Sequence, residues 1–310
     1  MLANKSSFKF ESSSKLAEIY VCKYFPADSD IKGIVQIAHG MAEHHKRYED
    51  FAEFLVANGF GVYINDHLGH GKSVTSDDEL GYFGEEKGYK NLVKDMKKLN
   101  DIIHKENPDV PVILFGHSMG SMLARLYCEK YGRTVASAIY CGTAGHNPAA
   151  KPGIAIVNAI AKLKGSHHRS DFINKLAFGT YNKKFAPART AFDWLTSDEK
   201  IVDKYIADPY CGFLFTTYGY RDLMMLIDAI NRSDWYTSVP RELPVYLIAG
   251  EDDPVGNYGK GIEEVYRGLI DTNHTDVSMK LFSGDRHEIL NEKDKTEVYN
   301  NILQWLKTAI

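Results

Sequence analysis

The sequence predicts an α/β fold built on a mostly parallel, doubly wound sheet. Short apolar, strand-like runs alternate with amphipathic helical segments over most of the 310 residues. This alternation is typical of parallel strands joined by crossover helices that cover both faces of a sheet. The alternation stops near Gly145 and resumes at Pro244. This interruption indicates a large insertion within the sheet domain.

The first two strand candidates, residues 8–10 and 17–24, predict an antiparallel hairpin, because a serine-rich turn separates them. Six further strand candidates follow in chain order, at residues 33–39, 61–65, 111–115, 136–141, 244–250 and 277–282. Helical spacing of apolar residues appears between or after them, at Phe51, Phe54 and Leu55, at Leu92, Met96, Leu99 and Ile103, and at Val298, Ile302 and Trp305.

We expect one discontinuous core domain, residues 1–145 and 239–310, and a mainly helical cap, residues 146–238, inserted after the sixth strand. An interruption this long requires structure of its own. Ligands of open α/β sheets bind beyond the carboxyl ends of the strands, so the cap is expected to cover the site. An insertion that packs only on the flank of the sheet is the alternative. The apolar segment 154–163 could rest transiently on a membrane surface, but packing inside the cap is favoured.

Composition excludes several classes of protein. The formal net charge of -4 gives no excess of basic residues of the kind that binds nucleic acid. The four cysteines have no C-x-x-C spacing, which argues against zinc and against a dense disulfide framework and fits the cytoplasm. Residues 1–7 lack the apolar core of a signal peptide. We therefore expect a cytoplasmic protein without metal or cofactor, whose oligomeric state stays open.

The stretch Gly116-His117-Ser118-Met119-Gly120 is the strongest chemical motif. An apolar strand candidate precedes it and good helix formers follow it. Strand, G-x-S-x-G, helix is the context of a nucleophile elbow, a tight turn that exposes a serine hydroxyl. Glycines suit this turn because neighbouring backbone leaves no room for side chains. Ser118 is therefore the predicted nucleophile.

A serine nucleophile requires a base and an acid that orients the base. His287 follows the last strand candidate and is the predicted base, whereas His274 lies in a polar turn and is expected to be solvated. The acid should follow the strand that ends at Gly250, where Asp253 is favoured and Asp252 is the alternative. Asp285 is expected to cap or to pair locally with Arg286.

An oxyanion hole requires two backbone N–H groups at the point where negative charge develops. One donor is expected from Met119, the residue after the nucleophile. The other is expected from Met41, in the turn after the strand candidate 33–39.

Four motifs occur in order along the chain, at residues 39–44, 66–73, 116–120 and 284–288. Together they resemble the lysophospholipase and monoacylglycerol lipase branch of the α/β-hydrolases, which includes serine aminopeptidase-like members. The resemblance implies an α/β-hydrolase fold. It also implies a catalytic triad of Ser118, Asp253 and His287, with oxyanion donors at Met41 and Met119.

The resemblance further implies substrate-binding residues. Glu43 and Arg47 would line the polar, alcohol end of the pocket and Val255 the acyl channel, with Gly40 and His117 of the same motifs also contacting substrate. The stretch 66–73 is mostly structural in this family, so no catalytic role is expected for its histidines.

These observations predict a serine hydrolase that cleaves carboxylic esters of single-chain acyl lipids, of the monoacylglycerol or lysophospholipid type, through an acyl-enzyme. A peptidase, thioesterase or acyltransferase with the same triad is the alternative. An aminopeptidase would need acidic groups that bind the free amine of its substrate. The cap contains four candidates, Asp193, Asp198, Glu199 and Asp203. A solvated helix face explains that cluster better. An inactive binding protein on this scaffold is disfavoured because every triad member has a candidate.

Overall fold

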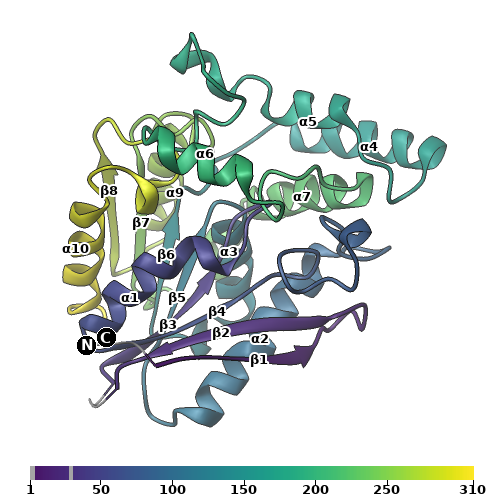
Figure 1. The fold of residues 1–310 in the computed structure, drawn as a ribbon. Coiled ribbons are helices and arrows are strands. Elements are labelled where there is room, and N and C mark those ends of the chain that lie inside the picture. The colour runs from purple at the N-terminus through teal and green to yellow at the C-terminus, as the bar shows by residue number, and fades with distance from the viewer. Residues whose placement is uncertain (1–3, 28–30) are drawn as a thin grey trace.

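Within residues 4–27 and 31–310, which the computed structural model describes, eight strands form one sheet (Figure 1). Their order across the sheet is β1-β2-β4-β3-β5-β6-β7-β8. The strands are β1 (Asn4–Glu11), β2 (Glu18–Phe25), β3 (Gly33–Ala38), β4 (Phe60–Asn65), β5 (Val112–His117), β6 (Ser137–Cys141), β7 (Val245–Gly250) and β8 (Val277–Phe282).

Strand pairing confirms the predicted sheet. β1 and β2 form the antiparallel hairpin, and β2 also runs antiparallel to β4. All other neighbours are parallel, from β4 through β3, β5, β6 and β7 to β8. The carboxyl ends of these parallel strands therefore meet at one edge of the sheet, as a doubly wound fold requires.

Ten α-helices occur in the described part of the chain: α1 (Glu49–Ala57), α2 (Tyr89–Glu106), α3 (Met119–Tyr131), α4 (Ala150–Lys164), α5 (Asp171–Phe178), α6 (Glu199–Ala207), α7 (Thr217–Ile230), α8 (Trp235–Ser238), α9 (Lys260–Asp271) and α10 (Lys295–Leu306). Successive side chains of β5 point to opposite faces of the sheet and show which helices cover each face. Ile113 and Phe115 pack in the core formed with α1 and α10, whereas Val112 and Leu114 pack in the core formed with α2, α3 and α9. The centre of the sheet is thus buried on both sides, whereas the edge strand β1 is largely exposed.

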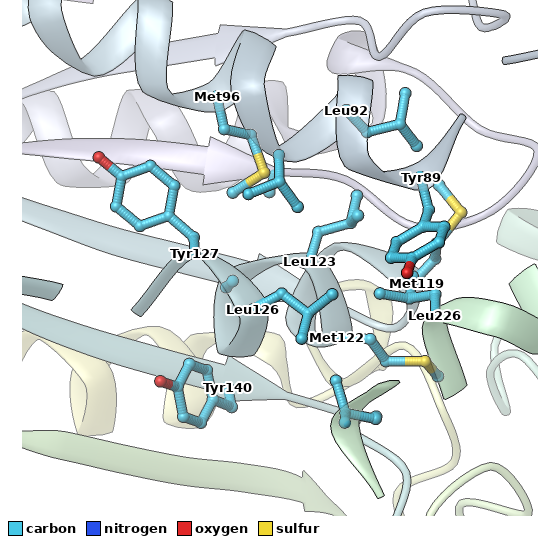
Figure 2. Packing of buried hydrophobic residues seen from close by; sticks show 14 of the residues in the cluster. Tyr89, Leu92, Met96, Met119, Met122, Leu123, Leu126, Tyr127, Tyr140 and Leu226 are labelled. Atoms are coloured by element: carbon cyan, nitrogen blue, oxygen red, sulfur yellow. The ribbon is translucent and has the colours of Figure 1, made fainter. Parts of the chain in front are cut away.

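Helix α3, which begins directly after Ser118, is held by this second core. Its residues Met122, Leu123 and Leu126 are buried, and in Figure 2 Leu123 lies on the side of α3 that faces Leu92 and Met96 of α2. Burying an aliphatic side chain of this size contributes about 1.5–3 kcal/mol. The start of α3, and with it the serine, is therefore firmly positioned.

Helices α4 to α7 follow β6 and lie together beyond one end of the sheet (Figure 1). α4 contains the predicted helix 154–163 and packs on α7, while α7 and α8 pack on α3. The indole Nε1 of Trp235 in α8 donates to the carbonyl of Arg125 at 3.0 Å. Across the described ranges, we find no helix that combines the length and the apolar character needed to cross a bilayer.

Candidate active site

Ser118 occupies the sharp turn between β5 and α3. Its backbone adopts φ 53° and ψ -121°, a left-handed conformation that is strained for serine. A side chain on Gly116 would place Cβ 2.4 Å from the carbonyl oxygen of Gly120, and one on Gly120 would place it 2.0 Å from that of Ala38. Only glycine fits at both positions, so the sequence motif and the turn geometry agree.

His287 is held by Asp253 at the ends of neighbouring strands. The Nδ1 of His287 lies 2.9 Å from Oδ2 of Asp253, and both side chains are buried. The other oxygen, Oδ1 of Asp253, accepts the N–H of Val255 at 2.8 Å. With Nδ1 donating to the carboxylate, Nε2 of the imidazole is left to accept a proton.

The alternative acids lie elsewhere. Asp252 forms an ion pair with Lys184 near the surface. Asp285 does not pair with Arg286, which corrects the sequence expectation, because the guanidinium donates instead to the carbonyls of Asp193 and Thr196. Burial raises the pKa of the Asp285 carboxyl to about 7, and the neighbouring carboxylates of Asp294 and Glu292 add to the rise.

Met41 and Met119 each line the cavity at Ser118. Among the described residues, neither backbone N–H donates to a protein acceptor. The N–H of the preceding residue in the first turn, Gly40, is by contrast taken by Oε1 of Glu43. Loop 39–44 (residues 39 to 44) is thus fixed by Glu43, while the two N–H groups proposed for the oxyanion remain available.

Glu43 is the centre of a buried polar network. It accepts from the hydroxyl of Tyr48 at 2.7 Å, and its carboxylate lies 3.3 Å from Arg47 and 3.5 Å from His117. Burial opposes ionisation of Glu43, but the contacts with His117 and Arg47 outweigh it and lower the pKa of the carboxyl. For His117, burial is likewise outweighed by Glu43, which raises the pKa of the imidazole. The geometry favours an ionised Glu43–His117 pair beside the nucleophile.

Arg47 does not line the cavity, which corrects the expected position of its side chain. Its guanidinium is held by Glu288, with one N–O distance of 2.7 Å, and lies 4.8 Å above the ring of Tyr205. Its two acidic partners, Glu43 and Glu288, do line the cavity. Glu288, for which sequence reasoning found no role, follows His287 directly, and this adjacency was the only available signal.

The cavity at Ser118 has a volume of about 330 Å³. Four of the five expected substrate-binding residues line it, namely Gly40, Glu43, His117 and Val255. The opposite wall comes from the segment between β6 and β7 and includes Phe178, Tyr181, Phe192, Trp194, Phe213 and Leu223. None of these cap residues could be singled out from sequence, because their aromatic pattern is equally typical of an ordinary core.

The segment between β6 and β7 is joined to loop 39–44 by several polar contacts. The carbonyl of Ala42 accepts the N–H of Gly212 at 2.9 Å and the hydroxyl of Tyr205 at 3.1 Å. His44 Nε2 lies 2.9 Å from Oδ2 of Asp208. The loop that carries Met41 is therefore positioned from both the sheet and the cap.

Three other buried histidines lie together, His39 at the start of loop 39–44 and His67 and His70 after β4, with ring centroids between 4.3 and 6.3 Å apart. Burial lowers the pKa of each imidazole, that of His70 to about 3. They do not line the cavity. His274 is also buried and bonded to the carbonyl of Leu269, so the expectation that it is solvated is wrong.

Groups that could hold a metal ion are found, within the described residues, beside the cavity rather than in it: His44, Asp208 and Cys211, and His44, His45 and Asp66. Neither group includes Ser118, Asp253 or His287. The arrangement around the serine contains the residue types of nucleophilic catalysis, a serine, a histidine and a carboxylate.

Comparisons with known proteins show which family the chain belongs to. Residues 29–294 match the family described as "Serine aminopeptidase, S33". A monoacylglycerol lipase from Mycolicibacterium smegmatis is 28% identical, over 90% of this chain and 89% of its own length. The human monoglyceride lipase is 25% identical, over 91% of this chain and 83% of its own.

A similar solved structure is that of a highly thermostable carboxyl esterase from Bacillus coagulans in complex with glycerol. It superposes with a TM-score of 0.92 at 32% identity and covers 100% of this chain and 99% of its own. The fold and the site define an α/β-hydrolase of the lipase and esterase class, a serine ester hydrolase. The chain belongs to the S33 serine aminopeptidase family, in its monoacylglycerol lipase-like branch.

Proposed function

We propose that this enzyme hydrolyses carboxylic esters of single-chain acyl lipids, of the monoacylglycerol or lysophospholipid type, through an acyl-enzyme. The observation that carries the proposal is the strained Ser118 lining the same cavity as a His287 held by Asp253. A serine hydroxyl becomes a competent nucleophile when an oriented imidazole removes its proton.

In the proposed mechanism, Oγ of Ser118 attacks the ester carbonyl while Nε2 of His287 takes the hydroxyl proton. The carboxylate of Asp253 orients the imidazole and stabilises the imidazolium. The N–H groups of Met41 and Met119 bind the oxyanion, and each such donor typically contributes about 3–4 kcal/mol to lowering the barrier. His287 then protonates the leaving alcohol, and water attacks the acyl-enzyme by the reverse path.

The cavity supports the substrate class. Its volume of about 330 Å³ lies within the usual range for small-molecule sites, roughly 300–1,000 Å³. The cap contributes an aromatic and aliphatic wall, which suits an acyl chain, whereas Glu43 and His117 provide a polar end, which suits the alcohol. Relatives named as monoacylglycerol lipases, and one carboxyl esterase solved with glycerol, point in the same direction.

The decisive experiment compares the parent enzyme with Ser118→Ala on p-nitrophenyl and glycerol esters of increasing acyl length. The variant should lose at least about 10⁴-fold in kcat with an unchanged melting temperature, and a fluorophosphonate probe should label only the parent. Ester hydrolysis at the parent rate by a folded Ser118→Ala would overturn the mechanism. A parent enzyme that resists the probe would instead favour an inactive binding protein.

The alternative, the same triad acting on a peptide, thioester or acyl acceptor, has less support. The four cap carboxylates that could grip a free amine do not line the cavity. Asp193 accepts from Arg189 and Thr190, Asp198 caps α6, and Asp203 pairs with Arg189. Side-by-side assays with ester, thioester and aminoacyl-naphthylamide substrates would decide between these bonds.

We also propose that residues 146–238 act as a cap over a core of residues 1–145 and 239–310, and that the cap touches membranes transiently. Leu163 and Phe172, on or beside the cap helices α4 and α5, are 86% and 63% exposed, and such apolar side chains can enter a lipid surface. Four free, buried cysteines support a cytoplasmic location. Co-sedimentation with lipid vesicles, compared with Phe172→Ser, tests the membrane contact.

A further inference from the structure

A nitrogen, an oxygen and a sulfur ligand converge where the cap meets loop 39–44. Nε2 of His44, a carboxylate oxygen of Asp208 and Sγ of Cys211 all lie within 4.8 Å of one another. His44 comes from loop 39–44, and the other two residues follow α6 in the cap. His44 and Cys211 are buried, whereas Asp208 is partly exposed. The group therefore has fixed ligands on the inside and an opening to solvent on the outside.

We propose that His44, Asp208 and Cys211 form a binding site for one divalent cation of the Zn²⁺ type, which fastens the cap to loop 39–44. Imidazole, carboxylate and thiolate are the three ligand types that Zn²⁺ takes in proteins, and three protein ligands leave a fourth position for water. The partly exposed side of Asp208 is where that water would lie.

The ligand spacing is compatible with a tetrahedral ion. Bond lengths near 2.0–2.3 Å place tetrahedral ligands about 3.3–3.8 Å apart. The His44–Asp208 contact of 2.9 Å must widen slightly and the thiol must approach, and each movement is about 1 Å or less. Asp208 lies at the end of α6 with a partly exposed carboxylate, whose Oδ2 contacts His44 while Oδ1 accepts the N–H of Tyr210 at 2.9 Å.

The three ligands lie among charged groups of both signs. Binding forms a metal–sulfur bond, breaks the S–H bond and releases that proton to solvent. The charged groups around Cys211 and Asp208 comprise three carboxylates and two cations, namely Asp208, Glu43, Glu288, Arg47 and Lys46.

The neighbouring group of His44, His45 and Asp66 is a poorer site. Oδ1 of Asp66 accepts both the N–H and the imidazole Nδ1 of His45 at 2.8 Å, and Oδ2 accepts the N–H of Lys72 at 2.8 Å. A metal there would compete with three hydrogen bonds to Asp66, whereas at Asp208 it would replace the contact between Oδ2 and His44 and could leave Oδ1 bonded to the N–H of Tyr210. The sequence expectation of no metal rested on cysteine spacing, which cannot reveal ligands separated by 164 residues.

The test measures Zn²⁺ binding directly, by competition with a chromophoric chelator, in the parent chain and in Asp208→Asn and Cys211→Ser. The parent should bind one ion per chain, and each substitution should weaken binding roughly tenfold or more. Asp203→Asn removes an exposed carboxylate from the same helix α6 and should leave the affinity unchanged. Co²⁺ should give a sulfur-to-metal charge-transfer absorption that Cys211→Ser abolishes.

Failure to saturate at micromolar Zn²⁺ would overturn the proposal. Saturable binding with equal affinity in the parent, Asp208→Asn and Cys211→Ser would also overturn it, because the ion would then lie elsewhere. Neither measurement uses catalytic activity, so its outcome is independent of the proposed ester hydrolysis.

Discussion

The sheet and the cap build different walls around the same cavity. On the sheet side, Ser118, Glu43 and His287 lie at strand ends or in short loops and are positioned by backbone geometry and buried polar contacts. On the cap side, residues such as Phe178 and Phe213 present mostly apolar surface. The difference indicates that the chemistry depends on exact hydrogen-bonded positions, whereas the choice of substrate depends on the shape of the cap wall.

The largest expected effect concerns the sheet side. Asp253→Asn should lower kcat roughly 10⁴-fold, because an amide at this position does not hold His287 in the tautomer that accepts the serine proton. Asp252→Asn is the matched control. Its carboxylate pairs with Lys184, so its steady-state kinetics on a p-nitrophenyl ester should stay within about twofold of the parent. A large loss of kcat in Asp252→Asn with a small loss in Asp253→Asn would mean that Asp252 is the catalytic acid.

Substitutions in the cap wall should change the preference for acyl-chain length rather than the rate of the chemical step. Phe178→Ala removes an aromatic group from the cavity wall and should lower kcat/KM for long-chain esters about 10–100-fold, as expected for a loss of roughly 1–3 kcal/mol of apolar contact. Acetate esters should be hydrolysed at nearly the parent rate. Phe172→Ala, on the same helix but exposed, is the control, and chain-length series on soluble esters compare the two. Equal losses for acetate and long-chain esters would contradict the division of roles.

A further prediction concerns Asp285, on the sheet side. Ionisation of its buried carboxyl is expected to lower the stability of the folded protein. Its raised pKa means that the folded state binds more protons than the unfolded state between about pH 4 and 7. Its contribution to stability therefore falls as the pH rises through this range. Asp285→Asn should raise the melting temperature at pH 8 by about 2–4 °C and by less at pH 5.

The exposed Asp276→Asn is the control for this pH dependence and should show the same small difference at both pH values. Thermal melts followed by circular dichroism provide the measurement. A stabilisation by Asp285→Asn that is larger at pH 5 than at pH 8 would show that the Asp285 carboxyl has no raised pKa.

The smallest expected effect is at Tyr205, whose hydroxyl joins the cap to loop 39–44. Tyr205→Phe removes the hydroxyl that donates to the carbonyl of Ala42, while the N–H of Gly212 still bonds to it. The loss of one neutral hydrogen bond, about 0.5–1.5 kcal/mol, should lower kcat roughly two- to threefold. Tyr210→Phe, close by in the chain, should leave kcat unchanged. If Tyr205→Phe and Tyr210→Phe behave alike, the cap does not position the loop through this hydroxyl.

Local motifs were sufficient to predict much of the fold and the residues brought together at the cavity. The strand, turn and helix around Ser118 are encoded by adjacent residues, and the alternating pattern predicts parallel strands whose ends meet. His287 and Asp253 could be named because each lies in the loop that follows a strand, five and three residues after its end. The choice between Asp252 and Asp253 was less certain, since it depends on which side of the turn each carboxylate faces.

The predictions for Arg47, Asp285 and His274 were wrong because burial of a polar group depends on distant partners. Arg47 turns to Glu288, which is 241 residues away in sequence. Asp285 is buried near Asp294, and His274 is bonded to the end of α9. No local pattern records such neighbours. Arg47 was therefore placed in the pocket by resemblance, Asp285 was given a local partner, and His274 was given the solvated role that its type often has.

By itself, the sequence determined the α/β architecture, the strained turn at Ser118 and the histidine and carboxylate that accompany it, because periodicity and turn chemistry act between near neighbours. Only the tertiary structure decided the cap wall of the cavity, the Glu43–Arg47–Glu288 network and the meeting of His44 with Asp208 and Cys211. These features join segments far apart along the chain, and their geometry exists only once the sheet and the cap have packed together.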